Sequence, residues 1–133
     1  MPSDNARFVP DLAFTSSWDH DGYVVVLNGL SIWYGGTSAA EPLFAGVVSL
    51  LNQFVVSNGV QSKPGLGNIN ARLYELAQTT PGVFHDVVSR DTIIPCSQGT
   101  PDCTTGQYSF QAGPGYDLAT GLGSLDVYQF VTN

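Results

Sequence analysis

The chain has 133 residues, 43% of them hydrophobic, which is enough for one globular core and requires no second domain. Its 11 acidic residues face only 4 Lys and Arg, so a net charge of -7 makes nucleic acids and anionic membranes poor partners. Only 11% of the residues are charged, a balance that suits a secreted protein covered by polar, uncharged loops.

The first elements that we expect are two short apolar runs, at residues 23–27 (YVVVL) and 32–34 (IWY). Asn28-Gly29 lies between them and is a strong hairpin turn signal, so we expect two strands joined there. The preceding Asp19-His20-Asp21-Gly22 starts like a calcium loop but lacks the later ligands and the closing glutamate. We interpret it as a plain turn.

The segment from Ser38 to about Ser57 is predicted to form a buried helix. It is apolar on almost every face through Leu51 and stops at the turn signal Asn58-Gly59. A helix that crosses a bilayer needs about 20 apolar residues, and this segment is expected to be too short and too interrupted for that. The interrupting residues are Pro42, Ser49 and Asn52.

Ser38 begins this helix after Gly35-Gly36-Thr37, and two roles are open to its hydroxyl. Free backbone N–H groups and the positive end of the helix dipole converge there and can stabilise an oxyanion. The glycines allow a sharp turn and the close approach of a substrate backbone, which suits a nucleophile. The spacing alone favours a second role, in which Ser38-Ala39-Ala40-Glu41 is a capping box and the hydroxyl caps the helix.

A nucleophilic serine also needs a base. The order Asp11, His20, Ser38 matches one known triad order, but these residues come from a short stretch of adjacent strands and a turn. His85 has Asp86 as its immediate neighbour, and neighbours rarely present a carboxylate to an imidazole. The remaining candidates are the carboxylates of Glu41 and Glu75. We expect the base to lie outside this chain.

The second half of the chain is expected to be mostly loop. A second helix is predicted over residues 72–77, capped by Asn70 and ended by Pro81-Gly82, and a last short helix runs from Leu125 to Val131. Between them, residues 84–124 form a long glycine-rich tract, and such a tract in a compact domain usually has a function or an ion that holds it.

The two cysteines bear on the cellular location. Cys96 and Cys103 bracket a short turn-rich segment that a local disulfide can close, which would place the protein outside the cell. Two free thiols are the alternative, and the spacing fits no zinc site. Residues 1–7 contain neither the basic region nor the apolar run of a secretion signal, so any such signal is expected to lie outside this chain.

The loop tract contains oxygen donors suited to calcium. Calcium takes six to eight oxygen ligands, typically two or more carboxylates with backbone carbonyls between them, and Asp86 and Asp117 can supply the charge. The stretch from Gly113 to Asp117 can turn alternate carbonyls inward, because its glycines tolerate unusual dihedral angles. The alternative is an ordinary pair of turns with solvated aspartates.

Three motifs occur in a specific order. They are Gly35-Gly36-Thr37-Ser38 with Pro42, Phe84-His85-Asp86-Val87, and Ala112-Gly113-Pro114-Gly115-Tyr116-Asp117 followed by Thr120-Gly121-Leu122-Gly123-Ser124. Together with Val9-Pro10-Asp11-Leu12-Ala13 they resemble the sedolisin family of serine-carboxyl peptidases, which have a subtilisin-like fold. The resemblance implies an α/β fold in which residues 1–133 are the C-terminal portion of the catalytic domain, roughly its last third.

The resemblance also implies roles for residues. Ser38 takes the position of the nucleophile, and a calcium site is implied from the carboxylates of Asp86 and Asp117. The carbonyls of Val87, Gly113 and Gly115 complete that site. In this family a glutamate replaces histidine as the base. An upstream aspartate supports that glutamate, and another aspartate assists the oxyanion. A carboxylate base is suited to activity at acidic pH, where histidine would be protonated. All three belong to sequence that precedes this chain in the family.

The leading hypothesis is therefore a secreted, calcium-bound, acid-acting endopeptidase of polypeptides, which this chain would form only with the missing N-terminal part of the domain. Alone it is expected to be inactive. Two departures from the family are Glu41, where a small residue is usual, and the short link between Asp19 and Gly35. The alternatives are an inactive remnant that serves as a calcium-stabilised structural or binding module, and a partner that completes a separately made N-terminal chain.

Overall fold

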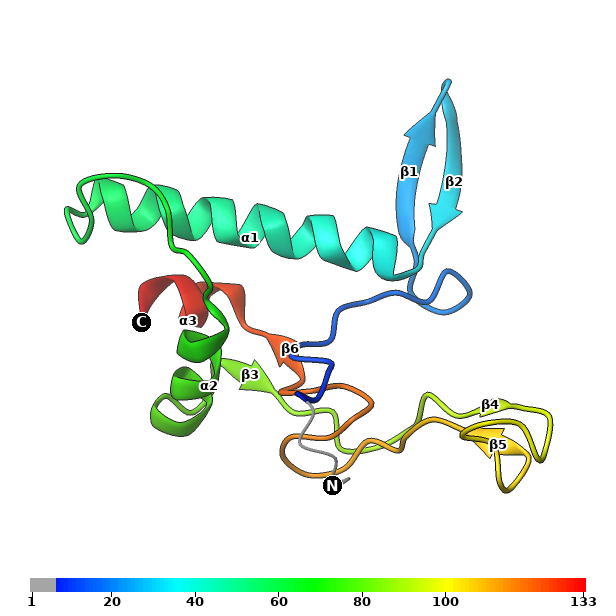
Figure 1. Ribbon diagram of the computed structural model, residues 1–133. Coiled ribbons are helices and arrows are strands. Elements are labelled where there is room, and N and C mark those ends of the chain that lie inside the picture. The colour runs from blue at the N-terminus through cyan, green and yellow to red at the C-terminus, as the bar shows by residue number, and fades with distance from the viewer. Residues whose placement is uncertain (1–6) are drawn as a thin grey trace. The chain divides into compact units, whose positions relative to one another are not determined.

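The computed structural model describes residues 7–133. The expectation about a secretion signal concerns residues 1–7, of which residues 1–6 lie outside the described part. Helices and strands are both present, as an α/β chain requires. In chain order the elements are β1 (Tyr23–Leu27), β2 (Leu30–Tyr34), α1 (Thr37–Ser57), α2 (Asn70–Thr79), β3 (Phe84–His85), β4 (Ile94–Pro95), β5 (Gln107–Tyr108), β6 (Ser124–Leu125) and α3 (Val127–Thr132) (Figure 1).

The described chain divides into two compact units. We call Phe14–Val83 with Asp126–Asn133 the helical unit, and the described residues of Met1–Ala13 with Phe84–Leu125 the loop unit. The helical unit contains the three helices and the β1–β2 hairpin, whereas the loop unit contains only two-residue strands. The serine motif therefore lies in one unit and the two aspartates of the proposed calcium site lie in the other.

The β1–β2 hairpin forms as its sequence predicts. The strands are antiparallel, from the pair Tyr23 and Tyr34 to the pair Leu27 and Leu30. Both turn residues have positive φ, 52° at Asn28 and 77° at Gly29, the conformation that a two-residue type I′ turn needs. Strand β2 begins two residues earlier than the apolar run at 32–34 indicates.

Helix α1 has the predicted length and stop. It ends at Ser57 and is followed by the cap residue Asn58, whose N–H donates to the carbonyl of Phe54 (3.0 Å), and Gly59 comes next with a φ of 71°. A positive φ just past the last turn is the usual glycine termination of a helix. Downstream, α2 buries Leu73 and Leu76, which are three residues apart and share one face.

The prediction that α1 is buried is wrong for the described chain. Val47 is its one buried residue, and Leu43 and Leu50 are 43% and 55% exposed. The expectation that the segment is too short for a membrane is also wrong, because the 21-residue helix passes that test by length and composition. Core helices of other proteins pass the same test, so length and composition do not decide what covers α1.

Two helix starts also differ from their predictions. Asn70 is the first residue of α2 rather than its cap, and its own N–H donates to the side chain of Asn68 (3.0 Å). Helix α3 begins at Val127 after Asp126, whose carboxylate accepts a hydrogen bond from the N–H of Gln129 (2.8 Å). An aspartate at this position stabilises a helix start, and the interpretation that began the helix at Leu125 missed it.

The loop unit is held together by close approaches of backbone. The N–H of Leu122 donates to the carbonyl of Asp11 (2.9 Å), and the N–H of Ala13 donates to that of Gly123 (3.0 Å). A Cβ added at Gly123 would lie 2.2 Å from the carbonyl oxygen of His85, and one at Gly121 would lie 2.5 Å from Asp11. Three motifs far apart in sequence therefore pack together, and only glycine fits between them.

Candidate functional site

Ser38 owes its position to the two glycines before it. A Cβ at Gly35 would lie 2.5 Å from the backbone N of Trp18, so that position requires close backbone contact with the preceding turn. Gly36 has φ 99° and ψ 163°, a conformation essentially restricted to glycine, and its N–H donates to the carbonyl of Ser16 (2.5 Å). The chain therefore turns sharply into α1 and places Ser38 in its first turn.

The capping interpretation of Ser38 is wrong. The cap position of α1 is Gly36, and no side chain of the described residues caps this end of the helix. Ser38 is the second helical residue and is exposed, and Glu41 is exposed one turn further along the helix. The hydroxyl thus lies at the positive end of a 21-residue helix, where unpaired N–H groups favour negative charge.

Two of the candidate bases, Asp11 and His85, belong to the loop unit, and within the described helical unit neither His20 nor Glu75 is hydrogen-bonded to Ser38. Asp11 forms an ion pair with Arg7 (2.5 Å), and the Nδ1 atom of His20 contacts the hydroxyl of Ser17 (3.2 Å). Glu75 pairs with Arg72 (2.9 Å) on α2, and His85 lies in β3 opposite Ser124.

The two aspartates of the proposed calcium site contact the same glycine-containing segment. The N–H of Gly115 donates to Oδ2 of Asp86 (2.7 Å), and the N–H of Gly113 donates to Oδ2 of Asp117 (2.9 Å). Tertiary structure therefore brings together residues that are 29 positions apart. Val87 follows Asp86 directly in the chain, so all five residues of the predicted set come from these two segments.

Asp117 also organises the turn that follows it. Its Oδ1 accepts hydrogen bonds from the N–H groups of Ala119 and Thr120 (2.8 Å each), and the Thr120 hydroxyl lies 3.2 Å from both carboxylate oxygens. The contact between Thr120 and Asp117 was not predicted from the sequence. An aspartate followed three residues later by a threonine is a recognisable turn signal, and this spacing points to the contact.

These hydrogen bonds keep Asp117 charged. Burial alone raises the pKa of its carboxyl group, but the donors at Gly113, Thr120 and Ala119 outweigh that effect and hold the pKa below its ordinary value of 3.8. A carboxylate that stays ionised in acidic solution is suited to bind a cation.

The predicted calcium ligands are all oxygen atoms. No three His, Cys, Asp or Glu side chains of the described residues gather in one place. A site at Asp86 and Asp117 would therefore rely on carboxylate and backbone oxygens, which is the ligand chemistry of calcium and not that of zinc.

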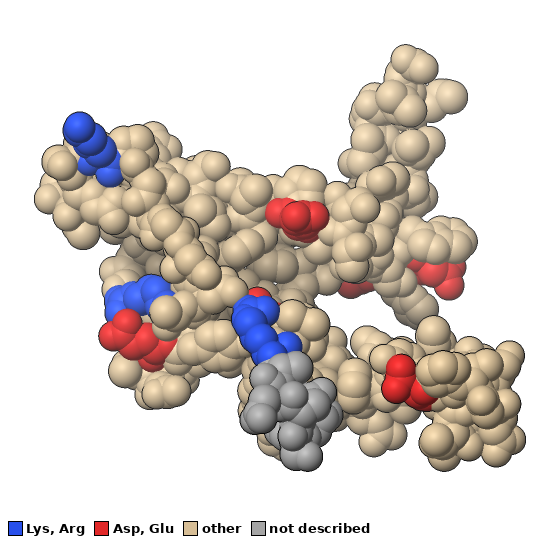
Figure 2. Space-filling view, in the orientation of Figure 1, with Lys and Arg blue, Asp and Glu red and all other residues tan. Residues whose placement is uncertain are grey.

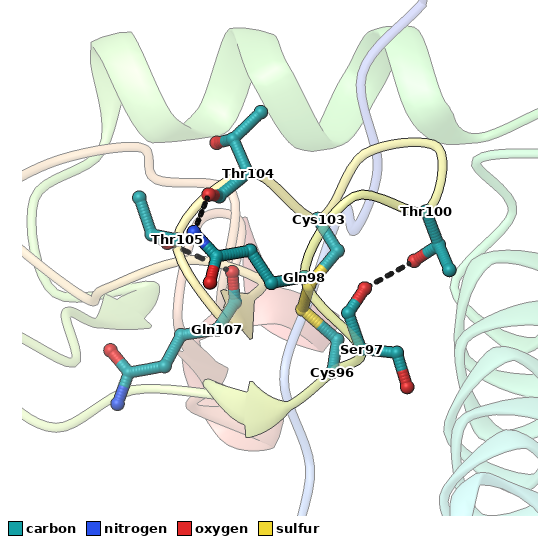
Figure 3. The surroundings of a disulfide bond; sticks show 8 residues. All are labelled: Cys96, Ser97, Gln98, Thr100, Cys103, Thr104, Thr105 and Gln107. Atoms are coloured by element: carbon teal, nitrogen blue, oxygen red, sulfur yellow. Dashed lines mark hydrogen bonds between the residues drawn. A yellow bond between two sulfur atoms is a disulfide. The ribbon is translucent and has the colours of Figure 1, made fainter.

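The cysteines form the predicted disulfide, Cys96–Cys103, with their Cα atoms 6.1 Å apart. Figure 3 shows the small loop that it closes, in which the Thr100 hydroxyl donates to the carbonyl of Ser97 (2.7 Å). The Gln98 side chain donates to the carbonyl of Thr104 (3.1 Å) in the same view. The alternative of two free thiols is excluded, and the bond fixes the end of the β4–β5 hairpin.

Comparison with known proteins gives a consistent set of relatives, although no family model matches the chain. Over 120 residues it is 39% identical to kumamolisin from Bacillus sp. (strain MN-32), a match that covers 90% of this chain and 18% of that relative. Human tripeptidyl-peptidase 1 is 37% identical over 121 residues, which cover 90% of this chain and 19% of the relative. The chain thus spans about a fifth of the length of these relatives.

A solved structure agrees. Pseudomonas sedolisin, described as a serine-carboxyl proteinase and determined in complex with two molecules of pseudo-iodotyrostatin, matches the chain with a TM-score of 0.67 and 29% sequence identity. The match covers 93% of this chain and 28% of the sedolisin chain. The likeness therefore includes nearly every described element.

Proposed function

The chain belongs to the sedolisin family of serine-carboxyl peptidases, and on that premise we propose that Ser38 is the nucleophile of an acid-acting endopeptidase. The observation that carries the proposal is the exposed Ser38 hydroxyl at the uncapped N-terminus of α1. A capping role would have given this serine a structural purpose, but Ser38 does not cap the helix.

In the proposed reaction the Ser38 oxygen attacks the carbonyl carbon of a peptide bond. The hydroxyl proton passes to a carboxylate base, the developing oxyanion is stabilised by N–H groups at the start of the helix, and the C–N bond then breaks. The amine leaves with a proton from the base, and water hydrolyses the acyl-enzyme. The base is supplied by polypeptide outside the described residues, in which no base contacts Ser38.

A serine-reactive fluorophosphonate probe tests the nucleophile. The probe should label Ser38 in the full-length protein, and Ser38→Ala should abolish the label. Ser57→Ala is a matched control, because Ser57 is an exposed serine at the other end of the same helix. Equal labelling of wild type and Ser38→Ala would overturn the assignment.

A calcium ion bound by Asp86, Val87, Gly113, Gly115 and Asp117 is the second part of the proposal. The contacts of both carboxylates with the segment between Gly113 and Gly115 support it. The ion would neutralise the two aspartates and stabilise the glycine-rich turns around them. The site lies in the loop unit, so its purpose is to order this part of the chain.

Thermal unfolding with and without a chelator tests the calcium site. Binding at a concentration about 100 times Kd stabilises a protein by about 2.7 kcal/mol, so the chelator should lower Tm clearly. Asp86→Asn and Asp117→Asn should remove that response. Asp102→Asn is the control, since it makes the same charge change in the disulfide loop. If chelation leaves Tm unchanged in the wild type, the metal assignment is wrong.

The second candidate function is a non-catalytic remnant that keeps the calcium-stabilised turns. Within the described helical unit, His20 and Glu75 contact partners other than Ser38, which favours it. A native protein that shows the calcium-dependent Tm but no probe labelling would support the remnant. Location outside the cell is proposed for both functions, because disulfides such as Cys96–Cys103 persist in oxidising compartments.

A further inference from the structure

A paired ribbon of chain connects the Cys96–Cys103 disulfide with the residues of the proposed calcium site. We call residues 90–112 the ribbon; its two legs run antiparallel, and the disulfide closes its tip. From the base to the tip, the paired residues are Arg90 with Ala112, Asp91 with Gln111, Thr92 with Phe110, Ile94 with Tyr108, Pro95 with Gln107 and Cys96 with Gly106. These pairs all keep one register, so the ladder runs in step between the two ends of the ribbon.

The proposed calcium ligands lie where the ribbon ends. Gly113 follows Ala112 directly on the second leg, and Asp86 precedes Arg90 on the first. The N–H of Gly115 donates to Oδ2 of Asp86 (2.7 Å), which joins the two legs beyond the last pair. Both ligand segments are thus continuations of the legs. How close the two segments stay to each other therefore depends on whether the legs stay paired.

Few other interactions hold the legs together in the described chain. Cys103 is the one buried residue of the ribbon. Between Thr92 and Gln111 the only charged residue is Asp102, so no ion pair can form across that stretch. Figure 2 shows the surface around β4 and β5 without any Lys or Arg. A two-stranded hairpin without a core is at best marginally stable in water, so the disulfide is the strongest link between the legs.

The ribbon also contains strained backbone. Three of its non-glycine residues have positive φ angles: 87° at Arg90, 63° at Asp102 and 107° at Ser109. Such conformations are unfavourable for residues with a side chain and persist only where the surrounding structure enforces them. At Ser109 the hydroxyl is held 2.7 Å from that of Thr92 on the opposite leg. Breaking the covalent link at the tip would let these residues relax, which favours separation of the legs.

We infer that the ribbon couples the disulfide to the calcium site, so that reduction of Cys96–Cys103 weakens calcium binding. The inference rests on the calcium part of the proposed function and adds a regulation of that site. When the legs separate, calcium has to bring two mobile ligand segments together, at a cost in chain entropy that the closed ribbon avoids. By linkage, calcium stabilises the disulfide against reduction by the same factor.

The redox step needs a low-molecular-weight thiol such as glutathione. Two thiol molecules deliver two electrons and two protons: the S–S bond breaks, Cys96 and Cys103 become thiols, and a disulfide forms between the two reductant molecules. Oxidising compartments preserve such bonds, whereas thiol-rich compartments reduce them. The calcium site would therefore be strongest outside the cell and weak where thiols are abundant.

Calorimetric titration of calcium into the full-length protein tests the coupling. The double variant Cys96→Ser, Cys103→Ser should raise the Kd for calcium on the order of 10-fold, within the range typical of coupled sites. Thr104→Ala is the control, because Thr104 is exposed in the same loop and its change leaves the disulfide in place. Equal Kd values for wild type and the double variant would overturn the inference but leave the calcium site intact. Absence of calcium binding by the oxidised wild type would overturn both.

Thr92→Pro tests the ribbon as the route of the coupling. It removes the N–H that donates to the carbonyl of Phe110 (3.0 Å) and the hydroxyl contact with Ser109 (2.7 Å), while the disulfide and the ligands remain. In this background the two cysteine substitutions should change the Kd for calcium little, since the ladder between the two sites is broken. A loss as large as in the wild-type background would overturn the inference.

The reciprocal measurement uses the wild type, in case Thr92→Pro does not fold. The full-length protein is equilibrated in glutathione redox buffers with calcium or with a chelator, and the reduced fraction of Cys96 is measured by alkylation and mass spectrometry. Calcium should shift the equilibrium toward the disulfide on the order of 10-fold. Asp86→Asn should abolish this shift, and Asp102→Asn should keep it. An equilibrium that ignores calcium, in a protein that binds calcium, would overturn the inference.

Discussion

At the scale of single residues, two glycines determine where the Ser38 hydroxyl lies. Gly36→Ala puts a side chain at φ 99° and ψ 163°, and such conformations cost about 1–3 kcal/mol for other residues. Gly35→Ala brings a Cβ within 2.5 Å of the Trp18 backbone. We expect both variants to lower the free energy of unfolding by amounts of that order, measured by urea denaturation.

Gly46→Ala provides the control for this prediction. Its added methyl meets no atom, and alanine is favoured over glycine in a helix interior by about 0.5–1 kcal/mol. It should therefore stabilise the isolated chain. A Gly36→Ala variant as stable as wild type would show that the turn into α1 differs from the one described.

At the scale of elements, the Cys96–Cys103 disulfide holds the β4–β5 hairpin. Closing a loop of about eight residues stabilises by about 2.5 kcal/mol in the chain-entropy model. Reduction should therefore speed hydrogen exchange of the Cys96 and Gly99 amides, which donate to the carbonyls of Gly106 (3.0 Å) and Cys103 (2.9 Å). Cys96→Ser should have the same effect.

Amides of α2 provide the internal comparison. Leu73 and Leu76 are buried in the helical unit, which the disulfide does not belong to, so reduction should leave their exchange unchanged. Equal loss of protection in α2 and in the β4–β5 hairpin would contradict the division into two units.

At the scale of the whole molecule, the proposal that the base comes from polypeptide outside the described residues predicts the activity. Losing one member of such a catalytic group costs on the order of 10⁶ in kcat, so the isolated chain should cleave no denatured protein at acidic or neutral pH. The measurement is release of labelled peptide fragments, with the Ser38→Ala variant as the comparison. Cleavage by the isolated chain that disappears in Ser38→Ala would reveal a base within these 133 residues.

The sequence predicted local features well because each depends on a short stretch of chain. Asn28-Gly29 can adopt the positive φ angles of a hairpin turn, Asn58-Gly59 can end a helix, and a glycine-rich run such as 112–123 cannot form long strands. The α/β class and the family followed from such local patterns. The cap roles of Ser38 and Asn70 were wrong, because the backbone turn at Gly36 and the side chain of Asn68 fix those helix starts.

By itself, then, the sequence determined the β1–β2 hairpin, the presence of three helices, the family motifs and the candidate nucleophile, and it left the disulfide open. Only the tertiary structure decided which segments meet: Asp86 with Gly115, Asp117 with Thr120, and Gly123 with His85. It also decided that Val47 is the one buried residue of α1. The reason is physical. A pattern of apolar residues predicts that a surface is covered, whereas the exposed fraction of each residue depends on which other segments contact it.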